Sequence, residues 1–304
     1  MQKIIIAVVS AAVVISVGVG VVIYGSLNWW NGKGGEKTHE HVWGAWVETT
    51  NADCTHAGVK TRVCEIDATH KETMTGTAAL GHARVEEVVK AASESENGKE
   101  VTLCGRAGCD LYENETVLWA LGSVGLSYDL VEDDAEMGTY YEVKATNYSS
   151  LVGQNIWIPA YHKNEGEYIP VKAVKEQGFM GTYAQNGILE VKFCEGDQME
   201  VFETGAFQDN KDIKMLAFPE SLKRIEQNAF TRCLSANRTT TEAPHTYAPF
   251  VIPASVEYVG MAVFGQCDST PVHVLGHANK QSTLEAGWYD DWTAALMGTI
   301  TYLG

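Results

Sequence analysis

The sequence predicts an α+β repeat fold, in which a solenoid of short strands and short helical or 3₁₀ turns follows a transmembrane helix and two small β-rich modules. Three observations predict it. One stretch of sequence recurs between residues 211 and 267, a second recurs between 41 and 122, and an uncharged apolar run extends from Ile4 to Tyr24. A unit that recurs cannot bury its apolar side alone and has to stack on its neighbours.

The apolar run from Ile4 to Tyr24 predicts a membrane-spanning helix within residues 1–30. As a helix it is about 30 Å long, the thickness of a bilayer core. It exceeds the usual core of a cleaved signal peptide and leads into Trp29 and Trp30, which suit the membrane interface. We therefore expect an uncleaved signal anchor, with a removed signal peptide as the alternative. Lys3 favours an internal N-terminus, so the bulk of a single-pass protein is extracellular, or secreted if the segment is cleaved.

Residues 31–41 are polar and contain glycine, so we expect a linker. His39 and His41 stand close together there, but they lack the spacing of a helical metal motif, which favours a solvated tether. Over the whole chain, 22 basic residues face 39 acidic ones. This balance argues against nucleic acid as a partner, because nucleic acid selects a basic surface.

Residues 42–82 and 83–122 are predicted to be two related small modules, the second one degenerate. The first ends in Ala79-Leu80-Gly81 and the second in Ala120-Leu121-Gly122, and Cys64 aligns with Cys104. After them, residues 123–145 alternate apolar and polar positions around an acidic turn at 132–134. This pattern is typical of a β-hairpin, which we expect to shield the first repeat.

The cysteines of the modules allow two interpretations. In an exported chain we expect a Cys54–Cys64 disulfide, with Cys104 and Cys109 pairing likewise. The alternative is a tetrahedral zinc site made of Cys54, Cys64, Asp67 and His70. We assign no residue to a metal and expect no cofactor.

The repeats are predicted over residues 146–285. The segment Lys211–Cys233 returns as Tyr247–Cys267, each with a short apolar strand closed by proline and then a turn with a short helical or 3₁₀ segment. Cys233 and Cys267 occupy one repeat position, and Phe207, Phe230 and Phe264 another, so we expect buried ladders of thiols and rings. Residues 286–304, with Trp288 and Trp292, are expected to cap the last repeat.

These repeats resemble the BspA-like class (type 5) of leucine-rich repeats, whose unit reads roughly L-x-x-I-x-I-P-x-x-V-x-x-I-G-x-x-A-F-x-x-C. The first module, with Trp43-Gly44-Ala45-Trp46, Cys54, Cys64 and Ala79-Leu80-Gly81-His82, is similar to small cysteine-containing modules of bacterial surface proteins, which often accompany such repeats. The resemblance implies a non-enzymatic protein of the cell surface that serves in adhesion or binding. Its partner would be an extracellular protein or glycan.

One row of residues is the candidate binding face. In each predicted strand the residue between two buried positions points outward, which selects Trp157, Lys192, Ala217, Val251 and His273. The alternatives are a zinc-binding protein or a purely structural surface spacer. A hydrolase is less favoured, because no nucleophile elbow, zincin helix or phosphate loop is present in the sequence, and we assign no catalytic residue.

Overall fold

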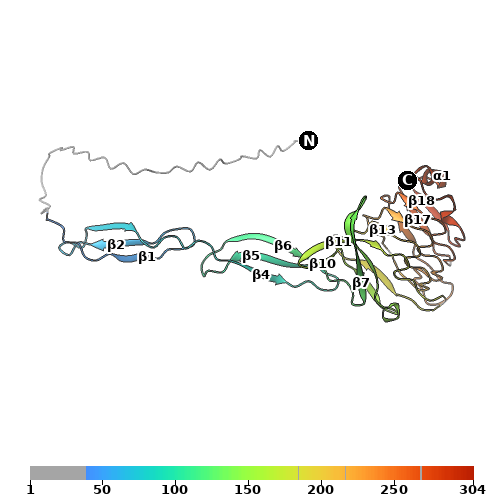
Figure 1. The fold of residues 1–304 in the computed structure, drawn as a ribbon, viewed down its shortest axis with the longest axis horizontal. Coiled ribbons are helices and arrows are strands. Elements are labelled where there is room, and N and C mark those ends of the chain that lie inside the picture. The colour runs from blue at the N-terminus through green and yellow to red at the C-terminus, as the bar shows by residue number, and fades with distance from the viewer. Residues whose placement is uncertain (1–38, 184, 216, 268) are drawn as a thin grey trace. The chain divides into compact units, whose positions relative to one another are not determined.

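The structure, a computed structural model, describes residues 39–183, 185–215, 217–267 and 269–304 (Figure 1). The predicted membrane-spanning helix of residues 1–30 and most of the 31–41 linker lie outside these residues. Within them, none of the helices combines the length and the apolar character needed to cross a bilayer.

The chain divides into two compact units. The first holds the described residues up to Asn51 together with Gly58–Gly76. Its strands β1 (Val47–Thr50), β2 (Val59–Val63) and β3 (Lys71–Thr75) form an antiparallel sheet in that order. The second unit takes Ala52–Ala57 and Thr77–Gly304. The residues predicted as one module, 42–82, are therefore shared between both units.

The second unit begins with another three-stranded antiparallel sheet. Its strands are β4 (Arg84–Lys90), β5 (Gly98–Cys104) and β6 (Tyr112–Leu118), with β5 in the middle. Every residue of β4 is exposed, and β5 buries Val101 and Cys104. So small a core contributes little hydrophobic stabilisation, and a sheet of this kind needs another source of stability.

Residues 126–303 form the repeat stack, in which two parallel ladders of short strands run through successive coils (Figure 1). The first ladder starts with an antiparallel hairpin, which confirms the hairpin expected over 123–145. Its later strands all pair in parallel with the coil before them. In spatial order the strands are β7 (Leu126–Asp134), β8 (Gly138–Ala145), β11 (Glu167–Val174), β13 (Val201–Phe202), β14 (Arg224–Ile225) and β16 (Tyr258–Val259).

The second ladder contains strands at four of the expected places, whereas the described residues of the strand expected over 213–218 form only an isolated bridge at Lys214. β9 (Asn155–Ile158) pairs in parallel with β12 (Glu190–Phe193), and Lys214 forms an isolated parallel bridge with Glu190. Further along, β15 (Phe250–Ile252) pairs in parallel with β17 (Val272–Leu275). Outside both ladders, β10 (Tyr161–Asn164) pairs antiparallel with β11, and η1 (Tyr148–Ser150) is a 3₁₀ turn.

The predicted α+β class is wrong. Val201–Phe202, Arg224–Ile225 and Tyr258–Val259, expected in helical or 3₁₀ turns, form parallel strands instead. The turns that follow also bond to the next coil: Phe207 N–H donates to Ala229 O at 2.8 Å, and Phe230 N–H donates to Val263 O at 2.8 Å. Because the backbone donors find partners in the neighbouring coil, no helix is needed to satisfy them. Among the described residues, helix is confined to η1, α1 (Lys280–Glu285) and η2 (Asp290–Thr293).

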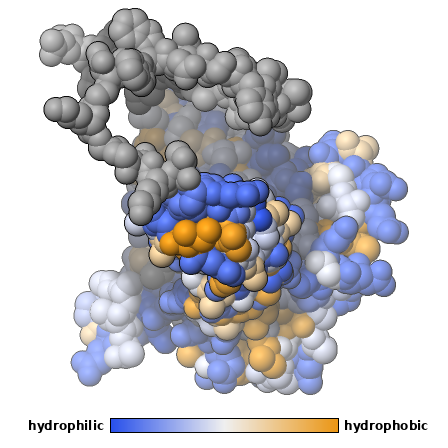
Figure 2. Space-filling view, turned by 90° about the vertical axis from the view of Figure 1, so that its left-hand side faces the viewer, coloured by the Kyte–Doolittle hydropathy of each residue, from blue (hydrophilic) through white to orange (hydrophobic). Residues whose placement is uncertain are grey.

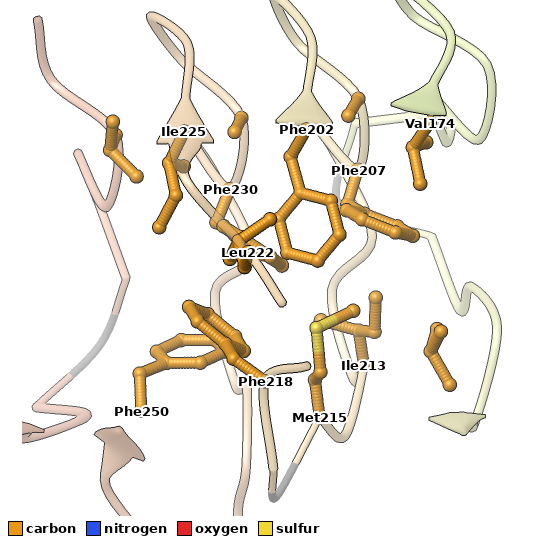
Figure 3. Packing of buried hydrophobic residues seen from close by; sticks show 14 of the residues in the cluster. Val174, Phe202, Phe207, Ile213, Met215, Phe218, Leu222, Ile225, Phe230 and Phe250 are labelled. Carbon is orange, nitrogen blue, oxygen red and sulfur yellow. The ribbon is translucent and has the colours of Figure 1, made fainter. Parts of the chain in front are cut away.

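The core of the stack is a continuous column of apolar side chains, with a ladder of phenylalanine rings (Figure 3). Phe207 and Phe230 stack at 5.2 Å between ring centroids, and Phe230 and Phe264 at 5.5 Å. Beside the rings, the Cys233 thiol donates to Phe207 O and the Cys267 thiol to Phe230 O, both at 3.2 Å. The expected ladders of rings and thiols are therefore confirmed. Phe179, from an earlier coil, extends the ring ladder.

The C-terminal segment caps the last coil, as expected. It consists of α1 (Lys280–Glu285), η2 (Asp290–Thr293) and β18 (Ile300–Leu303), which pairs in parallel with β17. Trp288 and Trp292 are buried, and Asp291 O accepts a hydrogen bond from Ala262 N–H. The segment thus covers apolar surface and also satisfies backbone donors of the last coil.

Hydrophilic residues cover most of the face shown in Figure 2, with small apolar areas between them. The sequence as a whole is acidic, with 39 acidic and 22 basic residues. A surface of this kind favours solubility.

Candidate functional site

The structure brings three of the five residues of the predicted binding face together. Trp157 and Lys192 are register partners on β9 and β12, and both line a groove with Ala217. Val251 and His273 are register partners on β15 and β17, and they are not among the residues that line this groove. All five are at least partly exposed, while Ile156, Ile158, Phe250 and Val274 beside them are buried. The alternation that selected the row is therefore present.

The groove at Trp157 combines an aromatic surface with charged groups. Its volume is about 380 Å³, and Phe193, Phe218 and Pro219 form its apolar wall. The Lys192 ammonium lies 5.1 Å from the centroid of the Trp157 ring and 2.9 Å from a Glu190 carboxylate oxygen. Asp197 and Glu220 add two further carboxylates.

Local hydrogen bonds hold the groove residues in place. Ser123 fixes the backbone of Trp157 on both sides: its hydroxyl accepts from Trp157 N–H at 2.8 Å, and its own N–H donates to Trp157 O at 3.0 Å. The Ser221 hydroxyl donates to Asp197 at 2.6 Å. A site whose backbone and carboxylate are fixed in this way loses little entropy when a ligand binds.

Sequence reasoning missed an acidic cleft along the first ladder. Its volume is about 620 Å³, and Glu200 lies in it between Lys172 at 2.9 Å and Lys223 at 2.5 Å. Burial, and then the nearby charge of Glu142, raise the pKa of Glu203 to about 7. Acidic residues adjoin the short strands of this ladder in the sequence, and this pattern could have indicated the cleft. It can be interpreted only when the apolar residues between them are known to form strands.

Neither expected disulfide is present in the structure, in which all seven cysteines are free. Cys54 Sγ lies 3.7 Å from Cys104 Sγ, and Cys109 Sγ lies 3.4 Å from His82 Nδ1. These four residues form one cluster, and His39, His41 and Cys64 form another. The alternative zinc set is therefore not assembled, because Cys54 and Cys64 belong to different clusters and Asp67 and His70 belong to neither.

In the second cluster, His39 and His41, which were predicted to belong to a solvated tether, lie beside Cys64. His39 Nε2 lies 3.2 Å from Cys64 Sγ. Burial raises the pKa of the Cys64 thiol, but hydrogen bonds from His41, from the Asp67 backbone and from His39 outweigh it and lower that pKa to about 6. In the other cluster, a hydrogen bond from the Arg106 backbone is the main cause that lowers the pKa of Cys104 to about 6.

Comparison with known proteins gives one distant likeness. The structure is similar to a crystal structure of a leucine-rich-repeat protein from T. pallidum (TpLRR), with a TM-score of 0.34 and 17% identity over 49% of this chain and 68% of that chain. At that level the likeness defines no family. The sequence matches no protein-family model and no curated protein.

Proposed function

We propose that this chain is a non-enzymatic binding protein of the cell surface, whose repeat stack recognises an extracellular protein or glycan through the groove at Trp157. The observation that carries the proposal is the placement of Trp157, Lys192 and Ala217, three outward positions from separate repeats, in one groove. Under this proposal the repeats are of the BspA-like leucine-rich type, and the apolar run of residues 4–24 anchors the chain in the membrane.

The chemistry of the groove suits a small polar ligand surface. A volume of about 380 Å³ falls within the range of about 300–1,000 Å³ that is usual for ligand sites. An indole ring offers a flat apolar face to a sugar ring or an aliphatic side chain, while Glu190, Asp197 and Glu220 accept hydrogen bonds from hydroxyl or amino groups. These features favour a hydroxyl-rich glycan or a basic peptide segment over an anionic ligand.

The proposal is tested by a binding screen of the full chain against host matrix proteins, glycans and bacterial cell-wall fragments. We expect Trp157→Ala to weaken binding of the ligand found by about 30-fold, as a central aromatic hot spot does. Trp157→Phe, which keeps a ring, is expected to retain most of the affinity. The matched control is Tyr289→Ala, since Tyr289 is 47% exposed and is not among the groove residues.

Each outcome of the screen has a distinct meaning. Equal weakening by Trp157→Ala and Tyr289→Ala would indicate a general loss of structure and would remove the support for the groove. Unchanged binding in Trp157→Ala would move the site elsewhere on the chain. No binding to any ligand would favour the structural spacer, and hydrolysis of a bound ligand that depends on Asp197 or Glu220 would contradict the non-enzymatic assignment.

A further inference from the structure

Cys54, His82, Cys104 and Cys109 meet in the second compact unit, although they come from separate parts of the sequence. Cys54 lies in the loop of residues 52–57, His82 precedes β4, Cys104 ends β5, and Cys109 lies in the turn before β6. One ligand atom from each residue lies within 4.8 Å of all the others. The cluster is independent of the groove at Trp157, and its interpretation does not depend on the proposed binding function.

The distances within the cluster match those around a tetrahedral metal ion. With zinc–sulfur bonds of about 2.3 Å and zinc–nitrogen bonds of about 2.0 Å, two sulfur ligands are separated by about 3.8 Å, and a sulfur and a nitrogen by about 3.5 Å. The Cys54 and Cys104 sulfurs are 3.7 Å apart, and Cys109 Sγ is 3.4 Å from His82 Nδ1. A disulfide needs about 2.05 Å between sulfurs, so the thiols are spaced for a shared ion and not for a covalent bond.

Backbone hydrogen bonds hold the four ligands in this arrangement. In the turn between β5 and β6, Cys109 N–H donates to Arg106 O at 3.2 Å. Gly108 in the same turn has a positive φ of 77°, which a residue with a side chain rarely adopts. Gly105 N–H donates to Ala83 O at 2.8 Å, which places the His82 segment beside this turn. The ligands from β5, from the turn and from the His82 segment therefore belong to one rigid frame.

The loop that carries Cys54 is fixed by its own contacts. Leu80 N–H donates to Asp53 O at 2.8 Å, which ties the loop to the segment before His82. The Asp53 carboxylate accepts from Thr55 N–H at 2.7 Å and from His56 N–H at 2.6 Å. Cys54 thus enters the cluster from a loop whose conformation is already set.

The first compact unit contains the same frame a second time. His41 and Cys64 correspond to His82 and Cys104 in the sequence duplication. Glu65 N–H donates to Val42 O at 2.8 Å, the counterpart of the bond from Gly105 to Ala83. Here His39 completes a group of three ligand residues whose ligand atoms also lie within 4.8 Å of one another. The same backbone arrangement therefore gathers ligand side chains twice in one chain.

We propose that Cys54, His82, Cys104 and Cys109 bind one zinc ion as a structural, four-coordinate site. Three thiolates and one imidazole form a ligand set of structural zinc sites, whereas calcium and magnesium require oxygen ligands. The ion joins the 52–57 loop to the β4–β6 sheet, which buries little apolar surface of its own. Zinc binding then supplies the stability that this small sheet lacks.

The test measures the metal content of the full chain after purification with zinc and dialysis. We expect Cys109→Ser to lose about one zinc ion per chain relative to the unsubstituted protein, because a structural site needs all four ligands. Two control variants leave the cluster of Cys54, His82, Cys104 and Cys109 intact. Cys194→Ser removes a buried thiol outside both clusters, and Cys64→Ser removes the thiol of the three-ligand cluster. Both are expected to keep the ion held by Cys109.

A second measurement does not use Cys109→Ser and so does not depend on whether that variant folds. X-ray absorption at the zinc edge, on Cys64→Ser and on the unsubstituted chain, is expected to show an ion with three sulfur ligands and one nitrogen ligand in both. The proposal is overturned if Cys109→Ser keeps the full zinc content, or if the bound zinc has only nitrogen and oxygen neighbours. It is also overturned if mass spectrometry finds Cys54 and Cys104 joined in a disulfide in the zinc-treated chain.

Discussion

Asn210, a fully buried residue in the repeat stack, offers a sharp test of how the coils are joined. Its Nδ2 donates to Phe179 O at 2.5 Å and to Phe207 O at 2.9 Å. Its Oδ1 accepts from the Tyr148 hydroxyl at 2.6 Å and from Ile188 N–H at 3.2 Å. One amide thus satisfies groups from several coils. Asn210→Asp keeps the shape of the side chain but replaces the donor with an oxygen that faces two carbonyl oxygens.

The loss in the free energy of unfolding caused by Asn210→Asp follows from the proton that the folded state has to take up. A buried carboxylate against two carbonyls is so unfavourable that the carboxyl becomes protonated, and its folded pKa rises above the unfolded value of about 3.9. At pH 7, about 3.1 pH units above the unfolded pKa, this proton uptake costs about 4 kcal/mol, at about 1.36 kcal/mol per pH unit. The protonated group donates one hydrogen bond in place of two, which adds about 1 kcal/mol.

The assay is urea unfolding of the full chain at pH 4 and pH 7, followed by far-ultraviolet circular dichroism. We expect Asn210→Asp to lower the free energy of unfolding by about 4–5 kcal/mol at pH 7 and by about 1 kcal/mol at pH 4. The difference arises because the cost of taking up the proton is present only above the unfolded pKa. Asn186→Asp, at an exposed position, is the matched control and is expected to change by less than about 0.5 kcal/mol. A loss at Asn210 that is equal at both pH values would refute the reasoning.

Two further predictions concern the core and the acidic cleft. Phe230 is fully buried between Phe207 and Phe264, so Phe230→Ala is expected to cost about 3–5 kcal/mol in urea unfolding; a cost below about 1 kcal/mol would contradict the stacked ladder. The pKa of Glu203 is raised from 4.5 to about 7, so the unfolded state releases this proton first, and stability should fall as pH rises from 4.5 to 7. Glu203→Gln is expected to flatten that fall in thermal melts across this range; an unchanged slope would show that Glu203 is not responsible.

The repeat signal in the sequence predicted the parts of the fold that depend on local spacing. Phe207, Phe230 and Phe264 recur at one repeat position and stack in the structure, and Trp288 and Trp292 cover the last coil. Such positions can be predicted from the sequence because the same environment recurs in each coil and selects the same side chain. The strands of the first ladder could not be predicted in this way. Two apolar residues such as Val201 and Phe202 show no period that separates a strand from a helical turn.

The groove and the thiol clusters were predicted to different extents. Alternation along the strands selected Trp157 and Lys192, and the parallel pairing of β9 and β12 makes them neighbours. Cys104 and Cys109, expected as one pair, lie in the same cluster, whereas Cys54 and Cys64, expected as the other pair, lie in different clusters. Cys54 lies beside Cys104 in the four-residue cluster. The duplication of the modules indicates this cluster only when His41 and His82 are compared along with Cys64 and Cys104.

The amino-acid sequence alone was enough to show that this protein consists of repeats, which side chains form their apolar column, and which strand positions face outward. These properties follow from periodicity, which a chain carries locally. The folded structure was needed to show that the turns pair as strands with the next coil, and that Cys54, His82, Cys104 and Cys109 converge. The physical reason is that hydrogen bonds between coils and contacts between a loop and a distant strand depend on the closure of long chain segments, which no local pattern records.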